Sequence, residues 1–293
     1  MIADCPPNSF FLKNFDLHNH SNRSDGLLTP AALVELAVKG GCDALALTDH
    51  DTTQGLNEAT EAAARTGLRL IPGVEISVTW RSARTSTTLH IVGLDIDAAN
   101  EGLQAGLQAI RDGRRVRAEL ISTDFDRIGI KGTLEGAYRH AENPEMIGRT
   151  HFARHLAAQG VVRNVGSAFN RFLVHGKPGY VAHEWAELSD AVAWIRGAGG
   201  VAVIAHPGRY KINTQEMRQL LTQFKALGGE AIEVVTGSHT RQHYSEYARL
   251  AREFGFLASR GADYHGPGES ACAPGKLPPL PPDLQPVWQL FDR

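Results

Sequence analysis

Short apolar runs of strand length alternate with amphipathic helical segments over the first hundred residues. The runs are apolar at nearly every position, which is typical of strands that are buried on both faces. Thr29-Pro30 and Gly40-Gly41 are suited to the start and the end of a helix. This pattern predicts a parallel α/β fold. The expected strands cover residues 15–20, 42–51, 68–77 and 88–97, and the helices between them cover residues 29–41 and 54–66.

The alternation stops near residue 98 and returns near residue 190. Helical patterns over residues 101–129, 149–160 and 165–175 predict a helical insertion that caps a substrate site. Strands are then expected over residues 201–210, 230–239 and 256–266, with helices over residues 188–200, 214–228 and 240–255. The proline-rich stretch from residue 273 predicts a loop. The expected units are residues 14–99 and 191–275 for the barrel, 100–190 for the insertion and 276–293 for the tail.

Composition narrows the possible functions. The 293 residues include 30 Lys and Arg against 32 Asp and Glu, so the chain lacks the strongly basic surface that tracks duplex DNA. Cys5, Cys42 and Cys272 are too few and too far apart for a disulfide framework or a cysteine-rich zinc site. The sequence shows no signal peptide and no apolar stretch of about 18 residues. We therefore expect a cytoplasmic protein without a membrane partner.

Histidine, aspartate and glutamate recur where the predicted strands end. The strand ends read DLHNH, TDHD, GVE, LH, AHPGR and GADYH. In a β/α barrel the carboxyl ends of the strands meet on one face, where active sites lie. Burying so many such groups together without a cation would cost too much free energy. The sequence therefore predicts a metal centre on this face, formed by the histidines, aspartates and glutamate of these strand ends.

The residue types agree with several divalent ions. Imidazole and carboxylate together suit Mn²⁺, Fe²⁺ or Zn²⁺, and the two oxygens of Glu75 can bridge two ions. His18 and His20 are two positions apart on a strand, so both side chains face the same side. Asp49 and Asp51 are candidates for orienting the imidazoles, whereas Asp16 could either cap a loop or act directly.

The motifs DLHNHSNRSDG, ALTDHD, PGVEIS, AHPGR and ADYHG resemble those of the polymerase-and-histidinol-phosphatase (PHP) family of the amidohydrolase superfamily. The resemblance covers residues 14–97 and 190–270. It implies a distorted seven-stranded β/α barrel of the TIM type that binds three divalent ions, with Mn²⁺ as the first choice and Fe²⁺ or Zn²⁺ as alternatives. By motif, the first ion would be held by His18, His20, Glu75 and Asp263, the second by Glu75, His90 and His206, and the third by Asp25, His50 and His265. Some relatives carry histidine in place of Asp25.

The helical insertion identifies a branch of the family. IGRTHFARHLAAQG, AFNRFLVHGKPGYV and HPGRY resemble the tryptophan-operon-linked branch, whose members are 3′,5′-nucleoside bisphosphate phosphatases and 5′-3′ exoribonucleases on short RNA. The resemblance implies hydrolysis of a 3′-phosphate, with a small nucleotide or short RNA as the partner. The alternatives are a histidinol-phosphate phosphatase, a non-enzymatic regulatory protein and a C–N hydrolase. In a regulatory protein without activity, the set of metal ligands should be incomplete.

A substrate with a second phosphate needs cationic side chains away from the metals. Arg23, Arg149, Lys177 and Arg209 are the candidates. The arginines of residues 111–117 are expected on a solvated helix face, with contact to RNA as the alternative.

Several more side chains near the expected site have weaker assignments. Glu75, His206 and Asp263 are the catalytic candidates, and the last two are also candidates for the proton donor. His151 and His155 have the spacing of a ligand pair on a helix, but the barrel set is already complete, so they are expected to pack or to contact substrate. Phe172 and Tyr180 are expected to pack, with stacking on a base as the alternative.

Overall fold

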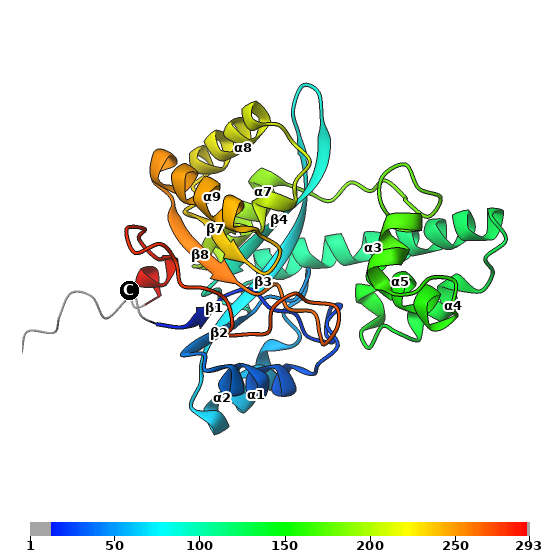
Figure 1. The fold of residues 1–293 in the computed structure, drawn as a ribbon, viewed down its shortest axis with the longest axis horizontal. Helices are drawn as coiled ribbons and strands as arrows, with labels where there is room; N and C mark the ends of the chain where they lie inside the picture. Colours follow the sequence, from blue (N-terminus) through cyan, green and yellow to red (C-terminus); the bar gives the residue numbers. More distant parts are fainter. Residues whose placement is uncertain (1–12, 292–293) are drawn as a thin grey trace, which may run out of the picture.

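The computed structural model describes residues 13–291, whose strands form a sheet that curves into a barrel (Figure 1). The strands are β1 Phe15–Asp16, β2 Ala44–Leu47, β3 Arg69–Arg81, β4 Ser86–Leu94, β5 Ala186–Glu187, β6 Val201–Ile204, β7 Ala231–Thr236 and β8 Leu257–Gly261. They follow the order β1-β2-β3-β4-β6-β7-β8, and β5 pairs with β3. The barrel nearly closes where the Leu17 N–H donates to the Arg260 carbonyl and the His20 N–H donates to the Tyr264 carbonyl, each at 2.9 Å. The predicted barrel is confirmed.

One strand departs from the expected parallel arrangement. β4 runs antiparallel to both β3 and β6. β3 continues beyond Glu75 to Arg81, and the chain returns through a turn in which the Ser82 N–H donates to the Thr85 carbonyl at 2.8 Å. A connection this short forms a hairpin and leaves no room for a crossover helix. His90 consequently lies within β4, opposite Ser77, and not at a carboxyl end of a strand.

Helices cover the outside of the barrel. In Figure 1, α1 and α2 lie beside β1 and β2, and α7, α8 and α9 lie on the other side of the sheet. The Thr29 side chain accepts a hydrogen bond from the Ala32 N–H at 3.2 Å, and Gly41 ends the first helix with a φ of 81°. These ends agree with the predicted capping residues. The helices are α1 Pro30–Gly40, α2 Leu56–Thr66, α7 Leu188–Gly197, α8 Thr214–Ala226 and α9 Arg241–Phe254.

Alternate residues of the strands face two separate apolar clusters. On β2, Leu45 and Leu47 pack toward the helices, whereas Ala44 and Ala46 belong to the cluster inside the barrel. That inner cluster also contains the short 3-10 helix η5 Val287–Leu290, whose Trp288 ring lies 4.9 Å from the ring of Phe15. The tail is therefore not simply a loop, because its last apolar residues fill the barrel.

The segment between β4 and β5 is helical and lies to one side of the barrel (Figure 1). It has its own apolar cluster, which includes Phe125, Phe152 and Phe172. The boundaries at residues 100 and 190 stay a prediction. Its elements are α3 Glu101–Arg127, α4 Thr133–Tyr138, the 3-10 helix η2 Pro144–Met146, α5 Arg149–Ala158, α6 Val165–Ala168 and the π-helix η3 Phe169–Leu173.

Two further expectations concern the whole chain. Cys42 and Cys272 are free thiols, and Cys5 lies outside the described residues. Among residues 13–291, none of the helices is both long enough and apolar enough to cross a membrane.

Candidate metal centre and basic pocket

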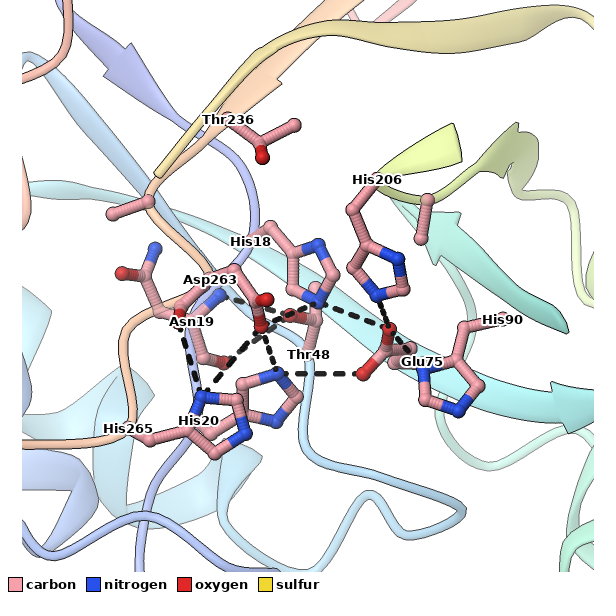
Figure 2. A network of polar contacts seen from close by, with 12 residues as sticks. His18, Asn19, His20, Thr48, Glu75, His90, His206, Thr236, Asp263 and His265 are labelled. Carbon is pink, nitrogen blue, oxygen red and sulfur yellow. Dashed lines mark hydrogen bonds and ion pairs between the residues drawn. The ribbon is translucent and has the colours of Figure 1, made fainter. Parts of the chain in front are cut away.

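The structure brings all nine predicted metal ligands together at one end of the barrel. They form four overlapping groups, and within each group the candidate ligand atoms lie within 4.8 Å of one another. Figure 2 shows side chains of β3, β4 and the segments after β1, β6 and β8 pointing toward one another. The groups are His20, Asp25, His50 and His265; His18, His20 and Asp263; His18, Glu75 and His206; and His50, Glu75 and His90.

Glu75 lies at the centre of these groups. Its Oε1 is 2.8 Å from His90 Nδ1 and 3.0 Å from His206 Nε2. Its Oε2 is 2.9 Å from His50 Nδ1 and 3.3 Å from His20 Nε2. The two oxygens therefore face different sets of imidazoles, which is the geometry that a carboxylate bridging two ions requires.

Two aspartates connect the remaining imidazoles. Asp263 Oδ1 lies 3.3 Å from His20 Nε2 and 3.7 Å from His18 Nε2. Asp25 Oδ1 lies 3.3 Å from His265 Nε2. The carboxylates thus alternate with the imidazoles through the cluster.

Buried polar atoms that make no hydrogen bond show that the cluster fits cations. Within the described part of the chain, His18 Nε2 and His20 Nε2 have no hydrogen-bond partner, and neither does one oxygen each of Asp25, Glu75 and Asp263. Leaving such an atom unsatisfied costs about 1–3 kcal/mol each. Nitrogen and carboxylate oxygen are the donors that Mn²⁺, Fe²⁺ and Zn²⁺ accept, so bound ions would satisfy these atoms.

The pKa values of the imidazoles depend on burial and on their neighbours. Burial and the nearby His265 lower the pKa of His20 to about 3, and burial and Arg209 lower the pKa of His206 to about 3. These two rings are therefore neutral, the form that binds a cation. Burial alone would also lower the pKa of His265, but the Asp25 carboxylate raises it to about 9. A cation bound by His265 would replace that proton.

Asp49 and Asp51 hold the chain around the centre. Asp49 accepts hydrogen bonds from the Ser21 N–H at 2.7 Å and from the Ser24 hydroxyl at 2.6 Å, and burial raises its pKa to about 6. Asp51 accepts a hydrogen bond from the Ser77 N–H at 2.7 Å. Neither aspartate belongs to the four groups, so both support the loops that carry the candidate ligands.

Asp16 also bonds to the backbone. Its carboxylate accepts hydrogen bonds from the Ala262 N–H at 2.8 Å and from the Gly275 N–H at 2.9 Å. The Asn19 side chain donates to it at 2.9 Å. Of its two proposed roles, these contacts favour the structural one.

Glu233 on β7 is a buried acid that was not among the predicted site residues. Its Oε1 lies 2.8 Å from His18 Nδ1, and its Oε2 accepts a hydrogen bond from the His206 N–H at 2.5 Å. His206 has a φ of 26° and Asp263 a φ of 53°, a region that non-glycine residues rarely adopt. The signal for Glu233 in the sequence was a single charged residue within the apolar run AIEVVT.

Three of the four arginines of residues 111–117 are not on a solvated helix face, so the expectation is wrong for those three. Arg111, Arg114 and Arg117 are buried, whereas Arg115 is exposed. Their spacing of three residues places them on the face of α3 that is turned toward the barrel mouth. Arg114 forms an ion pair with Asp51.

Arg114, Arg117, Arg149 and Arg209 line a pocket that also contains the candidate ligands Asp25, His50, His90 and His265. Burial and the neighbouring Arg149 and Arg114 lower the pKa of Arg117. The Arg117 side chain donates to the Val181 carbonyl at 3.2 Å and lies over the Trp185 ring at 5.2 Å. Both of those partners are neutral, so the pocket is suited to an anion.

The predicted substrate-binding residues lie in different places. Arg149 lines the pocket, and so does Arg209, which pairs with Asp263 at 2.7 Å. Arg23 instead pairs with Glu58 at 2.9 Å, and Lys177 is exposed. Neither of these two lines the pocket, and their contact with substrate stays a prediction.

The remaining candidates of the insertion pack as structural residues. His151 is buried, and its Nδ1 accepts a hydrogen bond from the Gly148 N–H at 3.0 Å at the start of α5. The His155 ring is so close to Gly136 that a Cβ there would clash with it. Phe172 is buried in the apolar cluster of the insertion, and the Tyr180 ring lies 5.3 Å from the ring of His175.

A second groove continues from the pocket. Both are lined by Thr150, Phe169, Arg209 and His265. The groove has a volume of about 740 Å³ and extends along α6 and the loop at residues 267–271. The metal centre is therefore accessible from two sides.

Comparisons with known proteins agree with this geometry. The PHP domain model matches residues 16–236. A 3′,5′-nucleoside bisphosphate phosphatase from Chromobacterium violaceum is 48% identical over 278 residues, covering 95% of this chain and 96% of that protein. The 5′-3′ exoribonuclease Rnm from Escherichia coli is 39% identical over 281 residues, covering 95% of this chain and 94% of that protein. The structure of an amidohydrolase from Chromobacterium violaceum with bound sulfate has a TM-score of 0.91 at 48% identity, covering 95% of this chain and 96% of that one.

Proposed function

Because this chain belongs to the PHP domain family, we propose that it is a metal-dependent phosphoesterase that removes the 3′-phosphate from 3′,5′-nucleoside bisphosphates. The observation that carries the proposal is that one pocket is lined both by arginines and by candidate metal ligands. The pocket lined by the buried Arg114 and Arg117 and the half-buried Arg149 also contains His50 and His265 of the metal centre. One phosphate can therefore bind the arginines while another lies against the metal ligands.

In this proposal the nine convergent residues hold three divalent ions, with Mn²⁺ as the first choice and Fe²⁺ or Zn²⁺ as alternatives. Such ions polarise phosphoryl oxygens, ease the deprotonation of water and offset negative charge. Glu75 would be a ligand of both the first and the second ion, since its two oxygens lie beside different imidazoles. By motif, the first ion would be held by His18, His20, Glu75 and Asp263, the second by Glu75, His90 and His206, and the third by Asp25, His50 and His265.

The arginines would position the substrate. Arg117 and Arg149 would bind the 5′-phosphate, because both line the pocket and the buried Arg117 has no carboxylate within ion-pair distance in the described chain. Arg209 lines both the pocket and the groove, so its guanidinium can contact the 3′-phosphoryl group. Fixed donors of this kind stabilise the charge that develops during in-line displacement.

Asp263 is the better placed of the two proton-transfer candidates. It lines the groove, whereas His206 lines neither cavity. As water forms its bond to phosphorus and the bond to the 3′-oxygen breaks, Asp263 can accept the proton from water and return it to the 3′-oxygen. The products would be a 5′-nucleotide and inorganic phosphate.

A 5′-3′ exoribonuclease is a second candidate function, and the groove favours it. With the 5′-phosphate in the arginine pocket, the chain beyond the first 3′-phosphate needs a path away from the metal centre. The groove along α6 and residues 267–271 supplies such a path. The same bond cleavage would then release a 5′-mononucleotide from short RNA.

A histidinol-phosphate phosphatase and a non-enzymatic regulatory protein agree less well with the site. Histidinol phosphate has a single phosphate, so it would leave the buried arginines beside the centre without an anion to bind. A regulatory protein without activity would not need nine convergent ligands.

One assay separates these functions. The protein is loaded with Mn²⁺, and release of phosphate or nucleotide is compared among 3′-phosphoadenosine 5′-phosphate, short 5′-phosphorylated RNA and histidinol phosphate. We expect hydrolysis of the bisphosphate to AMP and phosphate. Hydrolysis of histidinol phosphate alone would overturn the proposal.

A further inference from the structure

Helix α5 of the insertion contacts a loop that carries one candidate metal ligand. The Thr150 hydroxyl donates a hydrogen bond of 2.9 Å to Asp25 Oδ2. The other oxygen of that carboxylate, Oδ1, lies 3.3 Å from His265 Nε2 and makes no hydrogen bond in the described chain. Thr150 therefore fixes the carboxylate so that Oδ1 faces the imidazoles of the centre.

The next turn of α5 holds the same loop and a second one. The Arg154 guanidinium donates to the Asp25 carbonyl at 2.6 Å and makes a two-point contact with Glu269 at 2.8 and 2.9 Å. Arg154 is only 7% exposed, so this contact is largely shielded from solvent. Glu269 belongs to the loop after β8, where the Ser270 hydroxyl accepts a hydrogen bond from the His265 N–H at 2.7 Å.

These contacts divide the metal centre into two parts. Glu75 lies on β3, and Glu233 of β7 holds the other two members of its group, through His18 Nδ1 and the His206 N–H. In the group of His20, Asp25, His50 and His265, two members lie on loops that α5 holds from outside the barrel.

We propose that Thr150 and Arg154 are positioning residues that couple the third metal site to the helical insertion, so that the third ion can be lost while the first two stay bound. The proposal rests on the three-ion centre of the proposed function. Without the Thr150 hydroxyl, Asp25 can rotate and offer neither oxygen in a fixed position. Without Arg154, the loops that carry Asp25 and His265 lose their common partner. Removing a partner that orients a metal ligand lowers metal affinity about 10- to 100-fold.

The test counts ions at a fixed free Mn²⁺ concentration. Thr150→Val removes the hydroxyl at nearly constant shape, Thr150→Ser keeps it, and Arg154→Gln removes the two-point contact. Arg163→Gln, at an exposed arginine after α5, is the matched control. Ions per chain are measured by mass spectrometry after equilibrium dialysis, and thermal unfolding of each metal-loaded variant is recorded in parallel.

We expect three ions in the wild-type chain, in Thr150→Ser and in Arg163→Gln, but two in Thr150→Val and Arg154→Gln. The third ion should return to those two variants at about 10- to 100-fold higher free Mn²⁺. If Arg154→Gln does not fold, the Thr150 pair decides the question.

Three ions at unchanged affinity in Thr150→Val, or equal weakening of all three ions, would overturn the coupling. A wild-type chain that binds only two ions would overturn it as well, together with the three-ion centre. If the wild-type chain binds three ions and does not hydrolyse the bisphosphate, the proposed substrate is wrong while the variant counts still decide the coupling.

Discussion

His18 and Glu233 are joined by a hydrogen bond of 2.8 Å between Nδ1 and Oε1, and both side chains are buried inside the barrel. The bond leaves His18 Nε2 directed toward Glu75 at 3.3 Å. The second oxygen of Glu233 accepts from the His206 N–H, at a residue with a positive φ. One carboxylate therefore orients two candidate metal ligands from behind.

We expect Glu233→Gln to weaken Mn²⁺ binding about 10- to 100-fold, which is the usual effect of losing a carboxylate behind a metal-binding imidazole. Affinity is measured by equilibrium dialysis. Glu61→Gln, at an exposed residue of α2, serves as the control and should bind like the wild type. Unchanged affinity in both Glu233→Gln and Glu233→Ala would show that the bond is not needed.

The metal centre could be predicted from the sequence because its residue types are chemically distinctive. Histidine and carboxylate residues recur where apolar runs end, and a barrel brings those ends together. Glu233 was missed because it lies within the apolar run of β7. The sequence does not show which side chain would pair with a charge buried there. His90 was found, although on a strand of opposite direction, since hydrophobic pattern does not show which way a strand runs.

The basic pocket could not be predicted in the same way. Arg111, Arg114 and Arg117 form a polar stripe on α3, and a stripe that faces a cavity has the same spacing as one that faces water. Only the position of the insertion beside the barrel distinguishes the two cases. The burial of residues 287–290 likewise depends on a barrel interior that the local sequence does not show.

Glu75→Ala removes the carboxylate that the proposal places between two ions. We expect activity on 3′-phosphoadenosine 5′-phosphate to fall at least about 1000-fold, which corresponds to roughly 4 kcal/mol in the barrier. Phosphate release is the measurement, and Glu61→Gln is again the control. Activity that survives in Glu75→Ala would contradict the bridging role.

Removal of the ions should destabilise the fold. Each ion that binds only the folded chain adds about 2.7 kcal/mol at a free concentration 100 times its Kd. We therefore expect the Tm to fall by several degrees in excess EDTA and to recover on addition of Mn²⁺. Scanning calorimetry is the measurement. A Tm that does not respond to EDTA would argue against tightly bound ions at the nine ligands.

Arg117→Gln tests the assignment of the 5′-phosphate. We expect the KM for 3′-phosphoadenosine 5′-phosphate to rise roughly 10- to 100-fold, because a hydrogen bond to a charged group contributes about 1.5–3 kcal/mol. The KM for 3′-AMP, which lacks the 5′-phosphate, should not change. Arg115→Gln, on the exposed side of the same helix, is the control. An equal loss on both substrates would place Arg117 at the reacting phosphate or in the fold.

Ala271→Trp tests whether the groove carries the downstream part of an RNA substrate. Ala271 is exposed and lines the groove without lining the arginine pocket. An indole there should obstruct the nucleotides beyond the cleaved bond, whereas a bisphosphate ends at that bond. We expect kcat/KM for short 5′-phosphorylated RNA to fall about tenfold or more, consistent with losing roughly 1–3 kcal/mol of contact per base.

The same variant should hydrolyse 3′-phosphoadenosine 5′-phosphate at the wild-type rate, and Ala271→Ser should behave like the wild type on both substrates. The ratio of the two kcat/KM values is the informative quantity, because any loss of folded enzyme cancels from it. An unchanged ratio in Ala271→Trp would mean that RNA leaves the centre by another path. A wild-type enzyme that cleaves only the bisphosphate would restrict the function to the mononucleotide phosphatase.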